Sequence, residues 1–417
     1  MNSPLSVGQI GLWHLCQNDE VVSTAYNVVA AYRSTPLHAS ALEASLQALA
    51  CRHPILASRI EEYDSDLHFV SGATPTLELA RAVGTVESVS KIEMTRAFDF
   101  SKGPLFRITL VDTVDGLCDG LVMCMPHLAV DGASISVLFS DLAEAYAHQL
   151  TGSPCDPQAS CAAERVVPRE VDFLNSPEFA HQIHASVQAL HDVPPGLALF
   201  AQTEFGHVVY DAAVCALELG CEETSALYKF SNEHGVTPAA IHLTALQILL
   251  WRYTQQTDFS VNIPVSTRDD DQAGVVGYLT NLGVVRASVH GTMASASLLD
   301  MVADSLYCLL ERRSVPFPSL VLALKAQGAR SVAGLMQTCF NYERVNRGDI
   351  PFGPATLRAV PISARYAKNQ IKLDVEDGGL NGVRCTLTYD SGSLTSAVAE
   401  RMLTHYRMLL EAVVKQP

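Results

Sequence analysis

The feature that most constrains the fold is a strand–turn–helix pattern near residue 125. The apolar run 121–125 predicts a buried strand, and Asp131-Gly132 predicts a turn. Beyond the turn, apolar residues recur at helical spacing at Ile135, Leu138, Leu142 and Ala145. His127 is therefore expected at a strand end, four residues before a carboxylate. An imidazole held in this way is well placed to move a proton.

Two interpretations of this segment are open on its residues alone. Asp-Gly between apolar segments is a common turn, and a single histidine at a strand end often has only a structural role. In the other interpretation, His127 is a general acid–base in an active site. The rest of the chain has to decide between them.

Composition limits the class of protein. A chain of 417 residues is too long for one ordinary core and predicts two domains of about 200 residues each. Hydrophobic residues make up 48% and charged residues 17%, which is typical of a well-packed globular enzyme. The formal net charge of −16 argues against a nucleic-acid partner, because a polyanion would be repelled.

The sequence also predicts a location. Residues 1–6 lack the basic and apolar regions of a signal peptide, and no run approaches the roughly 20 apolar residues of a membrane helix. The eleven cysteines include no CxxC pair, which favours reduced thiols in a cytoplasmic protein. His181, His184 and His191 could suggest a metal site. Because HExxH and cysteine pairs are absent, a solvated helix face is favoured and no metal is expected.

The chain divides into two halves that each mix strand and helix patterns. Ser40 and Glu43 have capping-box spacing and predict the start of an amphipathic helix. Residues 152–168 are rich in proline and small residues and predict a linker. Thr237 and Pro238 predict the start of a helix in the second half. We therefore expect domains at 1–165 and 166–417, with the functional site in the cleft between them.

The segment from Pro126-His127 to Asp131-Gly132 resembles the HHxxxDG signature of condensation domains of nonribosomal peptide synthetases and of the wider acyltransferase superfamily. Here Pro126 replaces the first histidine. Further segments resemble family motifs in family order, including an opening motif SxAQxRLW and a motif (I/V)GxFVN. These segments are 5–13, 52–56, 262–268, 276–281, 315–317, 335–341 and 383–410.

The resemblance spans almost the whole chain and implies its fold. The expected class is α/β, in α+β layers, with two chloramphenicol-acetyltransferase-like subdomains in a V-shaped pseudo-dimer. The first subdomain, 1–165, would carry the Pro126-His127 motif, and the second would comprise 166–417.

The resemblance also implies a reaction. Family members join an acyl thioester to an amine, which gives an amide, or to a hydroxyl, which gives an ester, in nonribosomal peptide or hybrid polyketide biosynthesis, including that of antibiotics. The donor is expected on the phosphopantetheine arm of an acyl or peptidyl carrier protein, with coenzyme A as the alternative. No metal and no cofactor of the protein's own are implied. The chain is expected to act as a monomer, either free-standing or excised from a larger synthetase.

By resemblance, His127 is the catalytic histidine, because the second histidine of the motif is the one usually given the chemical role. Gly132 permits close approach of the backbone, and its N–H is a candidate oxyanion donor. Pro126 fixes φ and lacks a backbone donor, so it must lie where that N–H is not needed. The substitution keeps a second function open, a non-catalytic condensation-like module that docks carrier proteins.

The remaining site residues are also assigned by resemblance. Asp131 is expected to pair with Arg268 from the second half of the chain and so to fix the His127 loop. The alternative is an isolated Asp-Gly turn. Ser134 and Asn281 are candidates to line the substrate tunnel, and structural hydrogen bonding is an equal alternative for both.

Overall fold

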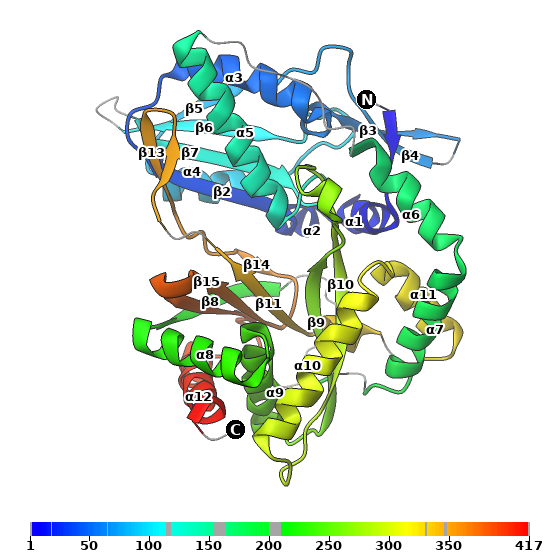
Figure 1. Cartoon of the computed structure of the whole chain (residues 1–417). Coiled ribbons are helices and arrows are strands. Elements are labelled where there is room, and N and C mark those ends of the chain that lie inside the picture. The colour runs from blue at the N-terminus through cyan, green and yellow to red at the C-terminus, as the bar shows by residue number, and fades with distance from the viewer. Residues whose placement is uncertain are drawn as a thin grey trace. The chain divides into compact units, whose positions relative to one another are not determined.

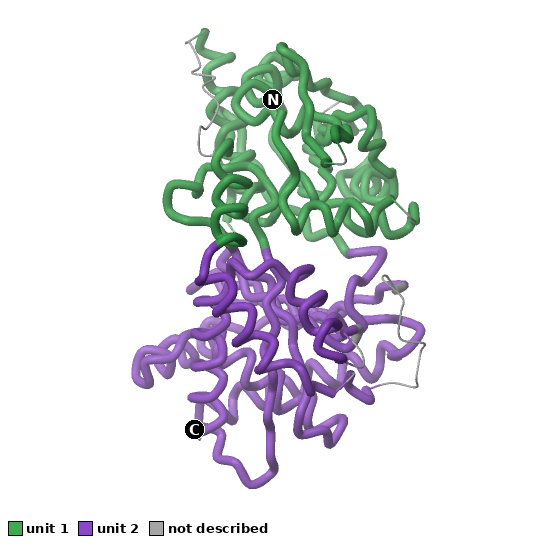
Figure 2. Tube along the Cα trace, turned by 90° about the vertical axis from the view of Figure 1, so that its right-hand side faces the viewer, with its two compact units in different colours: residues 1–175, 267–280, 348–363 green, residues 176–266, 281–347, 364–417 purple. Residues whose placement is uncertain are grey.

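The computed structural model describes residues 2–17, 19–64, 66–113, 118–152, 163–194, 196–199, 210–329, 332–345 and 348–415. By its internal contacts the chain forms two compact units, shown in two colours in Figure 2. Unit 1 comprises residues 1–175, 267–280 and 348–363. Unit 2 comprises residues 176–266, 281–347 and 364–417. Most of the predicted linker, residues 153–162, lies outside the described residues.

Unit 1 contains a six-stranded sheet and a small three-stranded sheet (Figure 1). The six-stranded sheet has the order β12-β13-β2-β7-β6-β5, and the small one β1-β4-β3. The strands are β1 (Asn2–Pro4), β2 (Asn27–Ser34), β3 (Arg59–Tyr63), β4 (Asp66–Val70), β5 (Leu79–Val83), β6 (Arg107–Asp112), β7 (Cys118–Pro126), β12 (Ile350–Phe352) and β13 (Ala355–Ala359). The α-helices are α1 (Val7–Gln17), α2 (Glu20–Ala25), α3 (Ala39–Arg52), α4 (Val86–Met94), α5 (Gly132–Thr151) and α6 (Val166–Leu174).

Helices cover both faces of the six-stranded sheet, and neighbouring residues of one strand contact helices on opposite faces. Ala31 of β2 belongs to an apolar cluster that also contains Val86 and Val89 of α4. The next residue, Tyr32, packs its ring against Phe139 of α5, with the ring centroids 4.9 Å apart. The strand β7 is thus buried on both sides, as its apolar run predicts.

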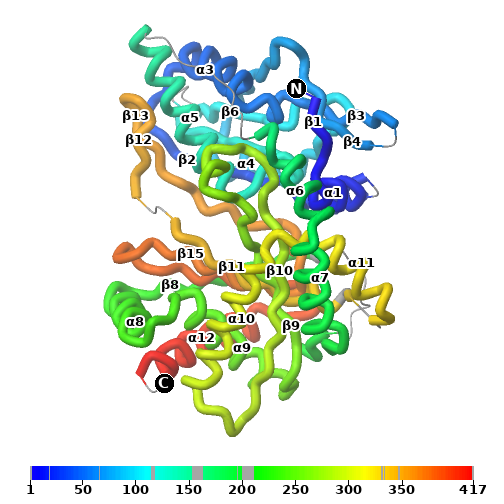
Figure 3. Tube along the Cα trace, turned by 45° about the vertical axis from the view of Figure 1, so that its right-hand side comes forward, coloured from blue at the N-terminus to red at the C-terminus, as the bar shows by residue number. Residues whose placement is uncertain are grey.

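A late segment of the chain completes this sheet. The hairpin β12–β13 pairs antiparallel with β2, so strands from opposite ends of the sequence lie side by side (Figure 3). Unit 1 is therefore discontinuous in sequence, whereas the predicted division at residues 165 and 166 follows chain order. The pairing of β13 with β2 explains the difference. Without β13, β2 would be an edge strand with unpaired backbone groups, and a segment from far along the chain pairs with them. The predicted domain limits stay a prediction.

Residues Arg52 and His53, from the family-like segment 52–56, hold α3 against α5. Arg52, the last residue of α3, pairs with Asp141 and Glu144 of α5 at 2.8 Å each. The buried His53 ring bonds the other Asp141 oxygen through Nε2 at 2.6 Å. These contacts fix the position of α5, whose first residues follow the predicted active-site loop.

Unit 2 is built on a seven-stranded sheet with the order β10-β9-β11-β15-β16-β8-β14. Its strands are β8 (Tyr210–Leu219), β9 (Asp258–Ser266), β10 (Thr280–Ser288), β11 (Thr338–Arg344), β14 (Tyr366–Ala367), β15 (Ile371–Asp377) and β16 (Val383–Asp390). Its α-helices are α7 (Pro177–Leu190), α8 (Cys221–His234), α9 (Pro238–Thr254), α10 (Ser295–Glu311), α11 (Phe317–Ala326) and α12 (Ser396–Lys415).

The core of unit 2 lies between this sheet and the helices α9 and α12. Along β15, buried residues alternate with partly exposed ones, and Ile371, Leu373 and Val375 enter the core. From α12, Met402 and Tyr406 pack into the same core at 0% exposure. In β16, buried residues alternate with partly exposed ones from Val383 to Leu387, and α12 places a stripe of apolar residues against the core.

Two predicted helix starts had different outcomes. The start at Thr237 and Pro238 is confirmed, since the Thr237 side chain accepts a bond from Ala240 N–H at 3.2 Å. The capping box at Ser40 is wrong, because α3 already begins at Ala39 and its cap residue, His38, makes no side-chain capping bond. In the described part of the chain, no helix combines the length and the apolar character needed to cross a membrane.

Candidate active site

The loop between β7 and α5 carries the predicted site. His127 directly follows β7 and donates its backbone N–H to the carbonyl of Tyr26 at 2.7 Å. The chain then turns tightly, because Ala129 N–H bonds the Pro126 carbonyl at 2.9 Å and Val130 N–H bonds the His127 carbonyl at 3.3 Å. The loop is buried apart from the half-buried His127 side chain.

One hydrogen bond defines the tautomer of the neutral His127 ring. Its Nδ1 lies 2.8 Å from the carbonyl oxygen of Val130. A carbonyl can only accept, so Nδ1 carries a proton in this bond. In the neutral ring Nε2 is then the basic nitrogen. This arrangement is the one that a general base requires.

The backbone explains why proline is tolerated at position 126. In an antiparallel ladder, residues alternately direct their backbone groups to one neighbour and to the other. Because His127 bonds Tyr26 on the β2 side, Pro126 directs its nitrogen to the β6 side. There β6 begins only at Arg107, which pairs with Cys124, so the ladder has already ended. The missing N–H at Pro126 therefore costs no ladder bond.

Asp131 is the N-cap residue of α5 and also an ionic partner. Its Oδ1 accepts the backbone N–H of Ser134 at 3.0 Å, and the Ser134 hydroxyl completes a capping box. The same carboxylate forms a two-bond ion pair with the Arg268 guanidinium, with Nη2 to Oδ1 at 2.8 Å. Leu279 N–H adds a further bond to Oδ2 at 2.9 Å.

These partners keep the buried carboxylate ionised. The Asp131 side chain is 1% exposed and that of Arg268 8% exposed. Burial alone would raise the pKa of Asp131, but the bonds and charge of Arg268, with those of Ser134, outweigh it and hold the pKa below its ordinary value. A buried carboxylate with this many donors is a rigid structural element.

The ion pair lies within unit 1. In chain order Arg268 stands in the second half of the sequence, but the segment 267–280 belongs by its contacts to unit 1. Thr267 and Leu279 close this segment, since Thr267 N–H bonds the Leu279 carbonyl at 2.8 Å. The expected pair is therefore present, and it joins two segments that are far apart in sequence but belong to one unit.

Ser134 is buried in the same network. Its Oγ accepts the Gly277 N–H at 3.1 Å and lies 2.9 Å from the Gly277 carbonyl oxygen. It also receives a bond from Arg268 at 3.1 Å. The side chain thus has the structural hydrogen bonds that the sequence left as an alternative, and its role in lining a tunnel stays a prediction.

Gly132 is the first residue of α5 and is exposed. The N–H groups of the first helical turn have no acceptor within their own helix, and the helix dipole adds positive potential there. The backbone N–H of Gly132 therefore has the character of an oxyanion donor. Its contact with a substrate oxygen stays a prediction.

Asn281 belongs to unit 2, not to the loop network. Its Nδ2 bonds the carbonyl of Arg313 at 2.9 Å, and its Oδ1 accepts the N–H of Phe317 at 3.0 Å. These bonds hold the turn before α11. Its predicted place along a substrate tunnel is not tested by these contacts and stays a prediction.

Three further residues hold the His127 loop, and sequence patterns did not assign them this role. Buried Gln9 of α1 donates Nε2–H to the Leu128 carbonyl at 2.9 Å. The rings of Tyr26 and Tyr278 lie 6.4 and 5.3 Å from the imidazole centroid. Gln9 and Tyr278 lie in recognised family-like segments, but a local pattern cannot show which distant loop a side chain contacts.

A cavity of about 470 Å³ lies within unit 1. Gln9, Tyr278 and Leu279 line part of it, and His53 and Phe69 line another part. Its size falls in the range of small-molecule pockets, roughly 300–1,000 Å³. Tyr278 therefore contacts both this cavity and the His127 ring.

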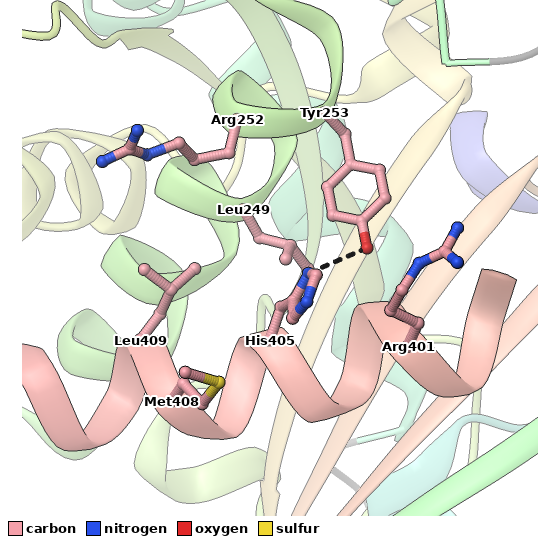
Figure 4. A pocket seen from close by; sticks show the side chains of 7 residues that line it. All are labelled: Leu249, Arg252, Tyr253, Arg401, His405, Met408 and Leu409. Carbon is pink, nitrogen blue, oxygen red and sulfur yellow. Dashed lines mark hydrogen bonds between the residues drawn. The ribbon is translucent and has the colours of Figure 1, made fainter.

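A second pocket, of about 550 Å³, lies in unit 2 between α9 and α12 (Figure 4). Its lining includes Leu249, Arg252, Arg401 and a hydrogen-bonded pair in which the Tyr253 hydroxyl lies 3.0 Å from Nδ1 of His405. It contains none of the residues that the sequence assigns to the site. Among the described residues, no group of three or more histidine, cysteine or acidic side chains is arranged to hold a metal ion.

Comparison with known proteins assigns the whole chain to a family. A family model described as Condensation domain matches residues 2–417. A linear gramicidin synthase of Brevibacillus parabrevis is 26% identical over 437 residues, which span 99% of this chain but only 8% of that protein. The dimodular nonribosomal peptide synthase of Bacillus subtilis is 26% identical over 439 residues, spanning 99% of this chain and 18% of that protein.

Solved structures agree in fold. The first condensation domain of the CDA synthetase has a TM-score of 0.85 at 17% identity, covering 100% of this chain and 98% of that one. The X-domain from teicoplanin biosynthesis has a TM-score of 0.84 at 20% identity, covering 99% of this chain and 95% of that one. The predicted α/β class, with the chloramphenicol-acetyltransferase-like fold of condensation domains, is thereby confirmed.

Proposed function

The chain belongs to the condensation-domain family, whose members are acyltransferases that form amide bonds in nonribosomal peptide synthesis, and we propose that it joins a carrier-bound acyl thioester to an amine. The observation that carries the proposal is the geometry of His127, whose Nδ1–H is fixed on a carbonyl and whose Nε2 is thereby basic. A hydroxyl acceptor, which gives an ester, is the variant reaction.

The reaction moves one proton from the acceptor to the leaving thiolate, in two transfers through His127. The acceptor nitrogen attacks the thioester carbonyl, a C–N bond forms, and the C–S bond of the tetrahedral intermediate breaks. His127 takes the proton from the attacking nitrogen and returns it to the departing thiolate. An amine acceptor depends mainly on orientation, whereas a hydroxyl acceptor depends on the base itself.

The loop supplies the other requirements. The N–H of Gly132, at the start of α5, is proposed to stabilise the oxyanion of the intermediate. The Asp131–Arg268 pair and the capping box hold Gly132 and His127 in fixed relation, because both flank the same buried turn. Ser134 and Asn281 are proposed to lie along the substrate path while making their structural bonds.

The proposed donor is the phosphopantetheine arm of an acyl or peptidyl carrier protein, with coenzyme A as the alternative source of the same thioester. Because a thioester is already activated, the reaction needs no nucleotide and no metal. The family acts with carrier proteins, and the chain matches a small part of a much longer relative. The partner protein and the product are therefore parts of this proposal.

A transfer assay tests the function. The protein is mixed with an acyl-loaded carrier protein and a panel of amines and alcohols, and intact-protein mass spectrometry follows loss of the acyl group from the carrier. We expect acyl loss and a new amide or ester product with the wild type. With the His127→Ala variant we expect only the background rate.

The second candidate function is a docking module without catalysis, which Pro126 favours because it removes the first histidine of the motif. In that case the carrier would bind the protein, but no acceptor would receive the acyl group. Pro126→His is the matched variant. If it starts transfer in an inactive wild type, the docking function holds and the catalytic proposal fails.

A further inference from the structure

Tyr278 has an unusual position between the first helix and the catalytic loop. Its ring meets the His127 imidazole edge to face, with the centroids 5.3 Å apart and the planes at 84°. Behind it lies Gly8 of α1, where an added Cβ would come within 3.0 Å of Tyr278 Cε1. The tyrosine ring is therefore closely packed between α1 and the imidazole.

The backbone of Tyr278 is anchored on the loop that carries His127. The preceding residue, Gly277, donates its N–H to Ser134 Oγ at 3.1 Å. The following residue, Leu279, donates its N–H to Asp131 Oδ2 at 2.9 Å. Both acceptors belong to the capping box of α5. The tyrosine thus has its Cα fixed relative to the imidazole by a hydrogen bond on either side.

We propose that Tyr278 is a positioning residue for the reaction, whose ring fixes the plane of the His127 imidazole. The bond from Nδ1 to the Val130 carbonyl holds one edge of the imidazole. The edge-to-face contact with Tyr278 adds a preferred angle for the ring plane, since aromatic rings favour edge-to-face or offset-stacked pairs. The inference rests on the proposed function for its catalytic consequence, but not for its structural one.

Gly8 is the second residue that determines the position of the Tyr278 ring. Position 8 of α1 is glycine and therefore has no side chain. A methyl group there would press on the tyrosine ring, which must then move by a few tenths of an ångström. The absence of a side chain at position 8 is therefore matched to the bulk at position 278.

Nitrogen-15 NMR of histidine side chains measures the state of the His127 ring directly. The His127 signals are assigned by their loss in His127→Ala, and the tautomer and titration of the ring are followed in each variant. In the wild type we expect a single tautomer with the proton on Nδ1. Tyr278→Phe should keep this state, whereas Tyr278→Leu should shift the His127 ring signals with the proton still on Nδ1, because the Val130 carbonyl holds that proton and only the ring plane loses its contact. Gly8→Ala should shift the His127 signals while leaving the protein folded, because alanine favours a helix over glycine.

Turnover is measured on the same proteins. We expect Tyr278→Leu to lower kcat about tenfold or more with little change in KM, since misplacement of a catalytic group acts on the chemical step. Tyr278→Phe should stay within about twofold of the wild type and keep its pH profile, because the proposal depends on the ring and not on the hydroxyl. Tyr307→Leu, at a residue that is 64% exposed in unit 2, is the matched control.

The outcomes separate this inference from the proposed function. Unchanged His127 signals in Tyr278→Leu would overturn the positioning role, whatever the activity. A loss of kcat in Tyr278→Phe equal to that in Tyr278→Leu would also overturn it, because the hydroxyl would then be the active group. Failure of the proposed function appears elsewhere, as undiminished turnover in His127→Ala.

Discussion

Two histidines in this protein show how the same side chain acquires different capacities. His127 is half-buried in a turn at the end of β7, with Nδ1 on a backbone carbonyl. His242 lies within α9 at 0% exposure, with Nδ1 2.6 Å from the Tyr406 hydroxyl. Among the described residues, Nε2 of His242 has no hydrogen-bond partner.

Their surroundings determine what each ring can do with a proton. Burial lowers the pKa of His242 to about 4, an effect that the charge of Asp377 only partly opposes. The ring is therefore neutral near pH 7 and packs against Tyr342 and Tyr406 as part of the core of unit 2. His127 instead has a half-buried side chain on a turn whose other residues are buried. The proposed proton transfer requires a fixed ring that a substrate can reach.

The largest expected effect is on catalysis. His127→Ala should lower acyl transfer by about 10²–10⁴-fold, because the proton acceptor is removed. The exposed His405 of unit 2 provides the control, and His405→Ala should leave transfer unchanged. The measurement is the initial rate of acyl loss from the carrier. Equal rates for wild type and His127→Ala would remove the catalytic distinction between the two histidines.

The loop around His127 can be broken through Asp131. Asp131→Ala leaves the Arg268 charge buried without its carboxylate and should lower the free energy of unfolding by about 3–5 kcal/mol. Asp349→Ala, which removes the exposed pair with Arg358, should cost about 0–1 kcal/mol. Urea denaturation of both variants measures the difference. Losses of similar size would show that the buried network does not hold the loop.

The neutrality of His242 predicts how stability depends on pH. The unfolded chain binds a proton at His242 near pH 6.5, and the folded chain only near pH 4. The stability that comes from the neutral ring is therefore complete above about pH 6.5 and is lost as the pH falls towards 4, by up to about 3 kcal/mol.

His242→Asn tests this dependence because asparagine does not titrate. The difference in unfolding free energy between wild type and variant should shrink steadily from pH 7 to pH 4.5, as measured by denaturant titration at each pH. His405→Asn, which removes an exposed histidine, is measured in parallel as the comparison variant. A constant difference for His242→Asn across this range would contradict the lowered pKa.

The smallest expected effect concerns the hydroxyl beside His242. Tyr406→Phe leaves Nδ1 of the buried ring without its partner and should cost about 1–3 kcal/mol of stability. Tyr307→Phe, at an exposed position, should change stability by no more than about 0.5 kcal/mol. Thermal and urea denaturation at pH 7 give both values. An unchanged free energy of unfolding in Tyr406→Phe would mean that His242 finds another partner in the core.

Sequence patterns predicted elements well where short-range chemistry sets them. The helix start at Thr237 and Pro238 needs only a hydroxyl that caps and a ring with a suitable φ, so the pattern was sufficient. The start of α3 was mispredicted because a tertiary bond acts there. The hydroxyl of Tyr146, on α5, accepts the backbone N–H of His38 at 2.9 Å. That partner is 108 residues away.

The candidate site shows the same division. The strand, the turn and the helix around His127 follow from apolar spacing, and all three are confirmed. Ser134 and Asn281 were left between tunnel and structural roles, because a side chain's identity does not reveal its partners. Their bonds to Gly277 and to the turn near Arg313 required the folded chain.

The sequence by itself determined the family, the strand-end position of His127 and the helix that follows it, since these depend on motif order and on residues within a few turns of one another. The tertiary structure decided which groups hold the imidazole. Arg268 reaches Asp131 across 137 residues, and Gln9 reaches Leu128 across 119. The physical reason is that such bonds form only when packing of the whole unit has brought their partners together, and that packing is not encoded in any local pattern.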